Sequence, residues 1–421
     1  MSRCFGFAQY DFDSLTLNGT PHGAPATSGF NRSKSLCRPT RGEANEPPDR
    51  AAATLNDDPR PWICILDGSV ERTGALIAAR REAELLAGEA RFLLVLPTES
   101  GVPDVDVPEF DRIERLPVAI LRKSASSLLT YGPTLLVGGW RLRKLLERQG
   151  CSRLQVNDFY LAHAFFTRML GFRGIISTWL RIDPRRFGFV GRVWLALASR
   201  FSDRLVVVSR TVRDQAPQWS EAALIYDPAP LLGNIGHTQG GRFVFLGNFI
   251  DGKGQDLAIS AFHRLAESRP EGELVFHGGT MGLDKNRAYL KRLKAAAAAG
   301  PGATRIRFEG PADGPAEAYA GALAALNFSR SESFSLTCQE ASAAGLPVIA
   351  TRSGGPDEII EDGRTGFLVE LDNVEAMTER MSWLLDHAEE ARLMGETGRK
   401  RVADLFSPQS AAVALREIFK L

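Results

Sequence analysis

Short hydrophobic runs alternate along the chain with longer stretches in which apolar residues recur every three or four positions. Short runs bounded by Gly, Pro, Asp or Ser are typical of buried strands, and the longer spacing is typical of helices. This alternation predicts an α/β fold built on parallel sheets. We expect strands at 62–66, 91–97, 134–137, 154–156, 174–177, 205–208, 242–246, 273–276, 306–309, 322–328 and 348–351.

Capping residues mark the helices between these strands. Ser335 is placed to cap a helix that Gly345 ends, Pro356 begins another, and Ser407 with Pro408 begins a helix running to Phe419. Further helices are expected at 74–87, 185–204, 257–267 and 316–324. On such sheets ligands bind beyond the carboxyl ends of the strands.

The stretch 322–358 has the chemistry of such a ligand site. Glu332 lies in the loop after one predicted strand, and Glu340 lies inside the helix that follows. Free backbone N–H groups at the helix start, around 335–337, suit an anion. A diphosphate flanked by two hydroxyl-binding acids has the layout of a nucleotide sugar.

The same stretch resembles the family 4, or group 1, retaining glycosyltransferases of the GT-B fold. Their signature is Glu, seven residues, Glu, an Ala-rich helix, Gly-x-Pro-Val-Ile-Ala, then Gly-Gly and Glu-Ile-Ile. The matching residues are Glu332, Glu340, Ala341, Gly345-Leu346-Pro347-Val348-Ile349-Ala350, Gly354-Gly355 and Glu358-Ile359-Ile360. The resemblance is strong over 240–410 and is one of layout only over 60–226.

The resemblance implies an α/β GT-B fold, in which two Rossmann-like domains with parallel sheets face each other across a cleft. It implies that Glu340 binds the donor's ribose hydroxyls and that Glu332 orients the donor sugar and stabilises charge at its anomeric carbon. Lys253 with Gly254, and the segment Phe334, Ser335, Leu336 and Thr337, would hold the diphosphate. The family transfers the sugar without a metal or cofactor, so none is expected.

One position departs from the family. In the loop 247–254, relatives have an arginine after the first glycine, where this chain has Asn248. The swap replaces a charged, fork-shaped donor with a neutral amide. The lost charge-assisted bond costs about 1.5–3 kcal/mol of phosphate binding unless another group compensates.

Acceptor-side residues are harder to assign. Relatives have a glycine-rich loop after the first strand, which Gly68 and Gly74 match loosely; we take Gly74 as a candidate and keep a plain turn as the alternative. Many relatives also have a histidine near 174–180, where this chain has none. Asp158 and His163 are the nearest polar substitutes, although a lone histidine is commonly a packed or capping residue.

Composition shifts predict the domain boundaries. Residues 1–58, rich in Gly, Pro, Ser, Thr and Asn, form a tail or an over-long start of the translated sequence. An acceptor-side Rossmann-like domain at 59–228 precedes a Pro- and Gly-rich linker at 229–241. The nucleotide-sugar-binding domain occupies 242–406, and a closing helix occupies 407–421.

The chain has 421 residues, 44% hydrophobic and 24% charged, as is ordinary for globular proteins. Its five scattered cysteines argue for a reducing compartment. No apolar run approaches the roughly 18 residues of a membrane span. The Asp104-Val105-Asp106 pair could hold a metal in another glycosyltransferase fold, but between Pro103 and Pro108 a solvated loop is the better interpretation.

Charge is uneven. Between Arg141 and Arg213 the chain has fifteen Arg/Lys and four Asp/Glu. The stretch 185–204 combines arginines with aromatic residues, which indicates either contact with an anionic membrane or an ordinary helix packed on the sheet. Nucleic acid is not expected, because no nucleic-acid-binding motif accompanies the arginines.

We therefore predict a cytoplasmic enzyme, and peripheral contact with the inner face of the plasma membrane is one of the two interpretations of its basic stretch. It would transfer a sugar from a nucleoside diphosphate sugar to a glycan or lipid-linked acceptor with retention, in cell-envelope or exopolysaccharide synthesis. The alternatives are a catalytically silent relative acting as a binding subunit, and a nucleotide-sugar epimerase.

Overall fold

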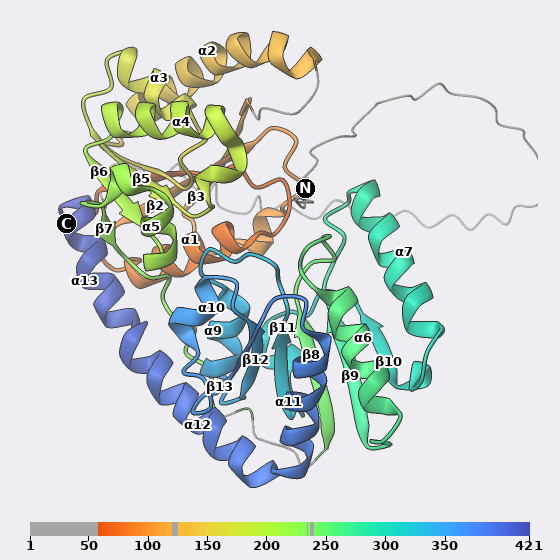
Figure 1. The fold of residues 1–421 in the computed structure, drawn as a ribbon. Coiled ribbons are helices and arrows are strands. Elements are labelled where there is room, and N and C mark those ends of the chain that lie inside the picture. Colours follow the sequence, from red (N-terminus) through yellow and green to blue (C-terminus); the bar gives the residue numbers. More distant parts are fainter. Residues whose placement is uncertain (1–57, 120–124, 234, 236–239) are drawn as a thin grey trace, which may run out of the picture. The chain divides into compact units, whose positions relative to one another are not determined.

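A parallel sheet of seven strands organises the first half of the chain (Figure 1). The computed structural model describes residues 58–119, 125–233, 235 and 240–421. The strand order is β3-β2-β1-β4-β5-β6-β7. The strands are β1 (Trp62–Leu66), β2 (Arg91–Pro97), β3 (Arg112–Leu116), β4 (Arg153–Val156), β5 (Ile175–Leu180), β6 (Arg204–Val207) and β7 (Ala223–Leu224).

The helices of this half connect the strands. They are α1 (Gly74–Leu85), α2 (Ala125–Arg148), α3 (His163–Met169), α4 (Gly188–Phe201) and α5 (Arg210–Gln215), with short 3₁₀ turns at Asp104–Asp106, Pro184–Phe187 and Pro217–Trp219. Helices α2, α3 and α4 contact one another and form one layer, at the top of Figure 1.

The second half has a parallel sheet of six strands in the order β10-β9-β8-β11-β12-β13. These are β8 (Gly241–Leu246), β9 (Gly272–His277), β10 (Ile306–Glu309), β11 (Ala324–Asn327), β12 (Val348–Thr351) and β13 (Gly366–Val369). The helices are α6 (Gln255–Ala266), α7 (Asp284–Ala298), α8 (Pro315–Tyr319), α9 (Leu336–Ala343), α10 (Gly355–Ile359), α11 (Val374–Asp386), α12 (Ala388–Leu405) and α13 (Pro408–Phe419), with a 3₁₀ turn at Ala303–Arg305. Both sheets lie within one compact unit that includes residues 61–421.

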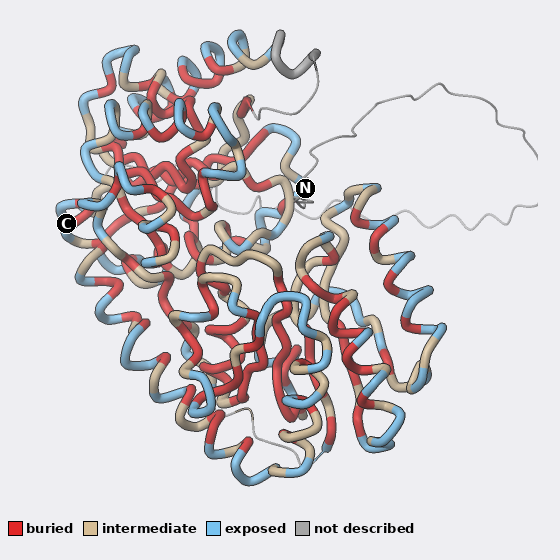
Figure 2. The backbone as a smooth tube through the Cα atoms, in the orientation of Figure 1, coloured by how far each residue is buried: buried red, intermediate tan, exposed pale blue. Residues whose placement is uncertain are grey.

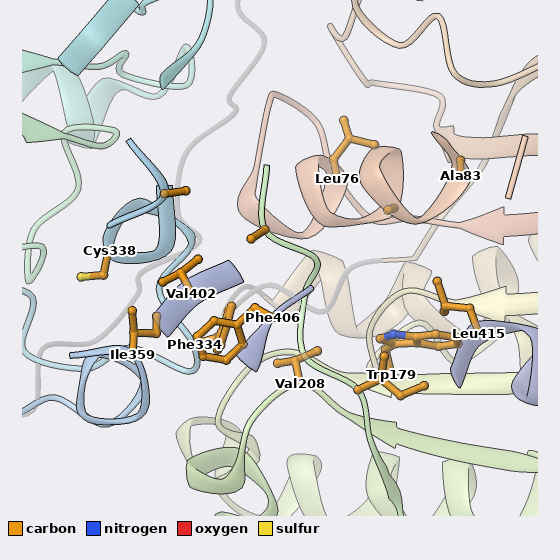
Figure 3. Packing of buried hydrophobic residues seen from close by; sticks show 14 of the residues in the cluster. Leu76, Ala83, Trp179, Val208, Phe334, Cys338, Ile359, Val402, Phe406 and Leu415 are labelled. Carbon is orange, nitrogen blue, oxygen red and sulfur yellow. The ribbon is translucent and has the colours of Figure 1, made fainter. Parts of the chain in front are cut away.

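Each sheet is buried on both faces, as parallel sheets require (Figure 2). Alternation along β1 shows this: Ile63 and Ile65 join one core cluster, and Cys64 and Leu66 join another. The first of these clusters continues from β1 and α1 through Phe334 and α12 into the second half (Figure 3). Apolar burial thus links the two sheets without a break.

The last helix described returns to the first sheet. Helix α13 contacts α1 and β5, and Phe419 stacks on the buried ring of Trp179 at 6.0 Å between centroids. The Arg153 side chain donates to the carbonyls of Phe419 and Lys420 at 2.6 and 2.9 Å. The first sheet is therefore completed by residues from the other end of the sequence.

Most predicted strands are confirmed, several of them to the residue. The strand expected at 134–137 is wrong, because these residues lie inside α2. The strand at 322–328 is shorter than expected, and the helix at 316–324 ends at Tyr319. Strands β3, β7 and β13 were not predicted. Residues 1–57 of the expected tail lie outside the described residues, and the predicted domain boundaries stay predictions.

Asp104 and Asp106 lie in a 3₁₀ turn, where Arg115 pairs with Asp104 at 2.8 Å. Among the described residues, no group of three or more His, Cys, Asp or Glu side chains is placed to hold a metal ion. No helix in the described part of the chain is long and apolar enough to cross a membrane.

Candidate functional site

The loops after β11 and β12 lie together at the carboxyl edge of the second sheet. The Glu332 amide donates to Ser353 O, and the Gly355 amide donates to Glu332 O, both at 3.0 Å. A Cβ on Gly355 would lie 2.1 Å from Phe334 O, so only glycine allows this approach. The loop that contains Glu332 and the loop that contains Gly354-Gly355 are apart in the sequence, and these bonds hold them side by side.

A third loop joins them from β8. Gly254 has a φ of 85°, and a Cβ there would lie 2.1 Å from the carbonyl oxygen of Phe328, just after β11. This close approach places Lys253 beside the β11 loop, where its Nζ lies 2.8 Å from Glu332 Oε1. Lys253, the cation predicted to bind the diphosphate, is thus in direct contact with Glu332, the acid predicted to lie beside the sugar.

The Glu332 carboxylate is held as an ion. Its Oε1 also accepts from the Ser329 hydroxyl at 2.7 Å, and its side chain is 13% exposed. Desolvation raises the pKa of Glu332, but the charge and hydrogen bond of Lys253 and the bond from Ser329 outweigh it, and the pKa ends below its ordinary value. A group held as an anion can stabilise positive charge next to it.

Ser335 caps α9 as predicted, with its side chain accepting from the Cys338 amide. Its φ of 84° is unusual for a residue with a side chain, and the Asn327 amide holds the hydroxyl at 2.9 Å. As the first residues of a helix, Leu336 and Thr337 have amides with no partner inside it. Free amides at the start of a helix suit an anion, and this role for Leu336 and Thr337 stays a prediction.

The first half of the chain reaches the same helix. A Cβ built on Gly74, the first residue of α1, would lie 3.5 Å from Leu336 Cδ1. Because of this short distance, the candidate acceptor-side glycine lies beside the start of α9. Gly74 is also exposed. This contact brings the loop after β1 to the predicted phosphate end.

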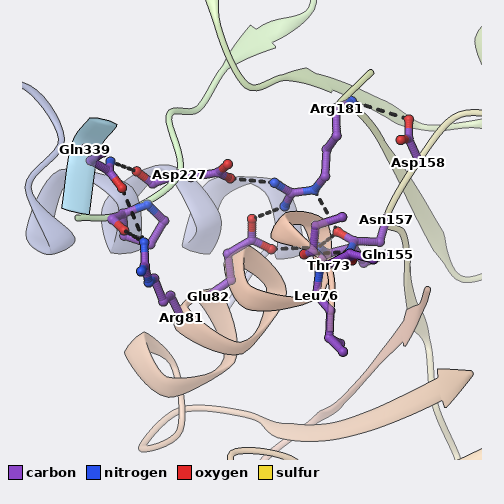
Figure 4. Close-up of polar contacts among 12 residues, drawn as sticks. Thr73, Leu76, Arg81, Glu82, Gln155, Asn157, Asp158, Arg181, Asp227 and Gln339 are labelled. Carbon is purple, nitrogen blue, oxygen red and sulfur yellow. Dashed lines mark hydrogen bonds and ion pairs between the residues drawn. The ribbon is translucent and has the colours of Figure 1, made fainter. Parts of the chain in front are cut away.

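Glu340 has a partner that the sequence did not indicate. Its side chain is 7% exposed and pairs with Arg81 of α1. Arg81 also donates to Gln339 Oε1 and Pro228 O, each at 3.3 Å, and Figure 4 shows Arg81 directed at Gln339. Burial raises the pKa of Glu340, and the charge and hydrogen bond of Arg81 lower it again in part.

Asn248 lies between the halves. Its Oδ1 accepts from the Gly279 amide at 3.2 Å, and its Nδ2 lies 3.5 Å from Arg72 O in the loop after β1. The loop at 277–282 is therefore next to the position where relatives have arginine. Arg72 is an exposed cation whose backbone touches that position.

The other acceptor-side candidates are buried in the first half. His163 Nε2 accepts from the Ala119 amide at 2.8 Å, and burial lowers the His163 pKa to about 4. Asp158 is 2% exposed, and burial raises its pKa to about 8. Its Oδ1 accepts from the Phe159 amide at 3.0 Å. The side chain of Phe334, a predicted donor-binding residue, packs against Tyr226 and Phe406 in the core. The proposed roles of these residues stay predictions.

The sequence also did not predict a buried polar network that connects α1 to other segments (Figure 4). Arg181 pairs with Glu82 and Asp227 at 2.5 Å each, and all three side chains are at most 7% exposed. The Gln339 amide donates to Asp227 O at 2.6 Å. Arg81 and Glu82, neighbours on α1, thus reach α9 and the residue that follows β5, respectively. No motif marks such pairs, because each joins segments far apart in sequence.

Comparison with known proteins agrees with this geometry. Residues 237–401 match the glycosyl transferases group 1 family. The chain is 27% identical over 241 residues to an uncharacterised glycosyltransferase, MJ1178, of Methanocaldococcus jannaschii, covering 55% of this chain and 63% of that protein. It is 32% identical over 184 residues to a GDP-mannose-dependent phosphatidylinositol monomannoside mannosyltransferase of Mycolicibacterium smegmatis, covering 42% and 46%. The chain therefore spans less than two thirds of the length of these relatives.

The fold is GT-B. The Anabaena protein Alr3699/HepE, solved in complex with UDP-glucose, superposes with a TM-score of 0.72 at 17% identity, over 85% of this chain and 99% of that one. Sucrose-phosphate synthase from Thermosynechococcus elongatus superposes with a TM-score of 0.69 at 20% identity, over 86% and 98%. Two Rossmann-like domains are common to all three structures.

Proposed function

We propose that this chain is a retaining glycosyltransferase that takes a sugar from a nucleoside diphosphate sugar. The observation that supports this best is the cluster of Lys253, Glu332 and the start of α9 at one sheet edge, with Glu340 one to two turns further along. The group 1 family match and the UDP-glucose complex of the HepE structure support the same donor class.

In this proposal the diphosphate lies at the start of α9. When the bond between the anomeric carbon and the diphosphate breaks, its electron pair leaves with the diphosphate. Lys253 and the amides of Leu336 and Thr337 stabilise the growing negative charge. These groups are fixed before the reaction, so they need little reorganisation as it proceeds.

Glu332 acts on the sugar side of the breaking bond. Its negative carboxylate stabilises the positive charge that develops at the anomeric carbon, and the same side chain orients the sugar. The acceptor hydroxyl bonds to the anomeric carbon on the face that the diphosphate leaves, and its proton goes to the leaving diphosphate. Retention follows, without the paired nucleophile and acid of retaining glycosidases.

We propose that no metal takes part, because Lys253 and the helix amides supply the positive charge that a metal would add. Full turnover in the presence of EDTA is the expected result. Loss of turnover that Mg²⁺ or Mn²⁺ restores would contradict this part of the proposal.

The decisive experiment is a thermal-shift panel of UDP-, GDP-, ADP-, CDP- and dTDP-sugars. A ligand at 100 times its Kd stabilises the native state by about 2.7 kcal/mol, so the cognate donor should raise the Tm. Stabilisation followed by turnover with a glycan or lipid-linked acceptor supports the transferase. Binding without turnover would instead indicate a silent binding subunit, and isomer formation without acceptor would indicate an epimerase.

We propose further that the layer of α2, α3 and α4 contacts an anionic membrane, which suits a lipid-linked acceptor in cell-envelope synthesis. An apolar pocket of about 220 Å³ lies among these helices, lined by aromatic and aliphatic side chains such as Phe165, Phe166 and Trp194. Phe189 and Met169, at its border, are 71% and 64% exposed. Outside their pocket-lining residues these helices present cations, including Arg141, Lys144, Arg148, Arg192 and Arg200.

Liposome flotation tests this contact. The protein should float with vesicles that contain phosphatidylglycerol and stay in solution with pure phosphatidylcholine, because each basic residue at an anionic surface adds about 1 kcal/mol. The double variant Phe189→Ser, Arg192→Ser should bind much less than the control Lys291→Ser, an exposed cation of the second half. Equal flotation of both variants would contradict the assignment.

A further inference from the structure

Arg81 is a residue of the first half whose guanidinium ends in the second. It lies on α1, and one of its nitrogens, Nη2, pairs with Glu340 Oε1. The other terminal nitrogen, Nη1, bonds Gln339 Oε1 and Pro228 O at 3.3 Å. An arginine fork bound at both ends has a fixed direction.

The other oxygen of Glu340 remains available. Among the described residues, Glu340 Oε2 has no hydrogen-bond partner. Because the carboxylate accepts on both oxygens, fixing Oε1 on Arg81 directs Oε2 without occupying it. We propose that Arg81 is a positioning residue for the donor's ribose, which holds Glu340 charged and oriented so that Oε2 accepts from the ribose hydroxyls. This inference rests on the proposed function.

Arg81 belongs to a larger set of buried contacts besides its ion pair with Glu340. Gln339, which accepts from Arg81, itself donates to Asp227 O at 2.6 Å. Asp227 in turn pairs with Arg181, which pairs with Glu82, the next residue after Arg81 on α1. A buried loop of contacts therefore returns to the helix on which it begins. Such a loop fixes the position of the guanidinium relative to α9.

Electrostatics supports the same role. Burial raises the pKa of Glu340, and the charge of Arg81 opposes it. The groups that act on this carboxylate are Arg81 from α1 and the Tyr319 hydroxyl from α8, and burial raises the pKa of the tyrosine well above its ordinary value. The tyrosine is therefore neutral near pH 7, and Arg81 is the cation that favours the ionised form of Glu340.

The test compares three full-length variants by calorimetric titration with UDP, GDP and ADP and with their 2′-deoxy and 3′-deoxy counterparts. Arg81→Met removes the charge, and Arg81→Lys keeps it. Arg80→Met is the matched control: Arg80 is the neighbouring residue on α1 and pairs with Glu109 at 2.6 Å, away from Glu340. Thermal melting of each variant shows whether it folds.

For the nucleotide that the wild type binds, Arg81→Met should weaken affinity about tenfold or more, the size of a lost charge-assisted contact. It should also abolish the preference for ribose over deoxyribose. The pH below which binding fails should move upward, because Glu340 without its cation takes up a proton more easily. Arg81→Lys should restore part of the affinity, and Arg80→Met should behave as the wild type.

Two outcomes overturn the inference. One is an Arg81→Met protein with wild-type affinity, ribose preference and pH profile. The other is loss of affinity with the ribose preference unchanged, which would make the residue merely structural. If Arg81→Met does not fold, the same two results with the neutral variant Arg81→Gln decide the matter. Failure of the wild type to bind any nucleoside diphosphate would instead contradict the proposed function itself.

Discussion

The two halves of the molecule are built on similar parallel sheets but use buried charge differently. In the second half, Glu332 and Lys253 pair at the edge of the site, and the Glu332 pKa is lowered. In the first half, Asp158 and Glu82 lie deep behind the sheet edge, and burial raises the pKa of each. Charges at the edge of a site can act on a ligand, whereas deeply buried ones mainly determine stability and its dependence on pH.

The largest effect expected from this contrast is on stability. Arg181→Met leaves Glu82 and Asp227 buried without their cation, so the free energy of unfolding should fall by about 3–5 kcal/mol. Urea denaturation measures the loss. Arg185→Met, in which the lost side chain is 65% exposed, is the control and should change stability little. Equal stability of the two variants would contradict the contrast between the halves.

In the second half the expected effect is on turnover. Glu332→Gln keeps the shape of the side chain but removes its charge, so turnover should fall by about 10²–10³-fold while the Tm changes little. Steady-state kinetics at saturating donor measures it. Asp251→Asn, which alters an exposed acid of the neighbouring loop, should retain wild-type turnover. A fully active Glu332→Gln enzyme would remove this acid from the mechanism.

A smaller effect, on the pH dependence of stability, is expected at Asp158. Its folded-state pKa of about 8 exceeds the ordinary value of 3.8, so its contribution to stability is complete below 3.8 and is lost as the pH rises to 8. Between pH 6 and pH 8 the wild type should therefore lose about 2 kcal/mol more than Asp158→Asn. Urea titrations at the two pH values measure this difference, and parallel curves would contradict it.

The smallest expected effect is a gain. Asn248→Arg restores the cation that relatives have in this loop, and donor affinity should rise about tenfold, or 1.4 kcal/mol. Calorimetric titration with the cognate nucleoside diphosphate measures it. An unchanged affinity would mean that a nearby cation already compensates, and Arg72, whose carbonyl lies 3.5 Å from Asn248, would be the first to replace.

The difference between local patterns and long-range contacts explains how much of the structure could be predicted from the sequence. The segments β1, β2, β10 and β12 were predicted to the residue, because β1, β2 and β12 are mainly apolar runs and β10 alternates apolar and charged residues, both of which are local patterns. Ser335 was predicted from a local capping pattern, and Lys253 and Glu332 were predicted from family motifs that are short and local in the sequence. Arg81 escaped, because a contact between α1 and α9 depends on how the chain folds and leaves no local pattern.

Two errors in the first half have physical causes. Residues 134–137 have the composition of a strand between Pro133 and Gly138, but they lie within α2, which includes that proline. A Cβ on Gly138 would lie 2.6 Å from the His163 ring, so this glycine serves the close packing of α2 on α3. Strand β3 was missed because its sequence, RIERL, is mostly charged, as is common at a sheet edge.

The return of α13 to the first sheet has a consequence for how the protein is made. Trp179 contacts Phe419, and Arg153 bonds the carbonyls of Phe419 and Lys420, so the first sheet lacks these partners until α13 has been made. Synthesis of residues 61–230 alone would therefore yield an unfinished domain. The half that is made first completes its packing only with a helix that is made later.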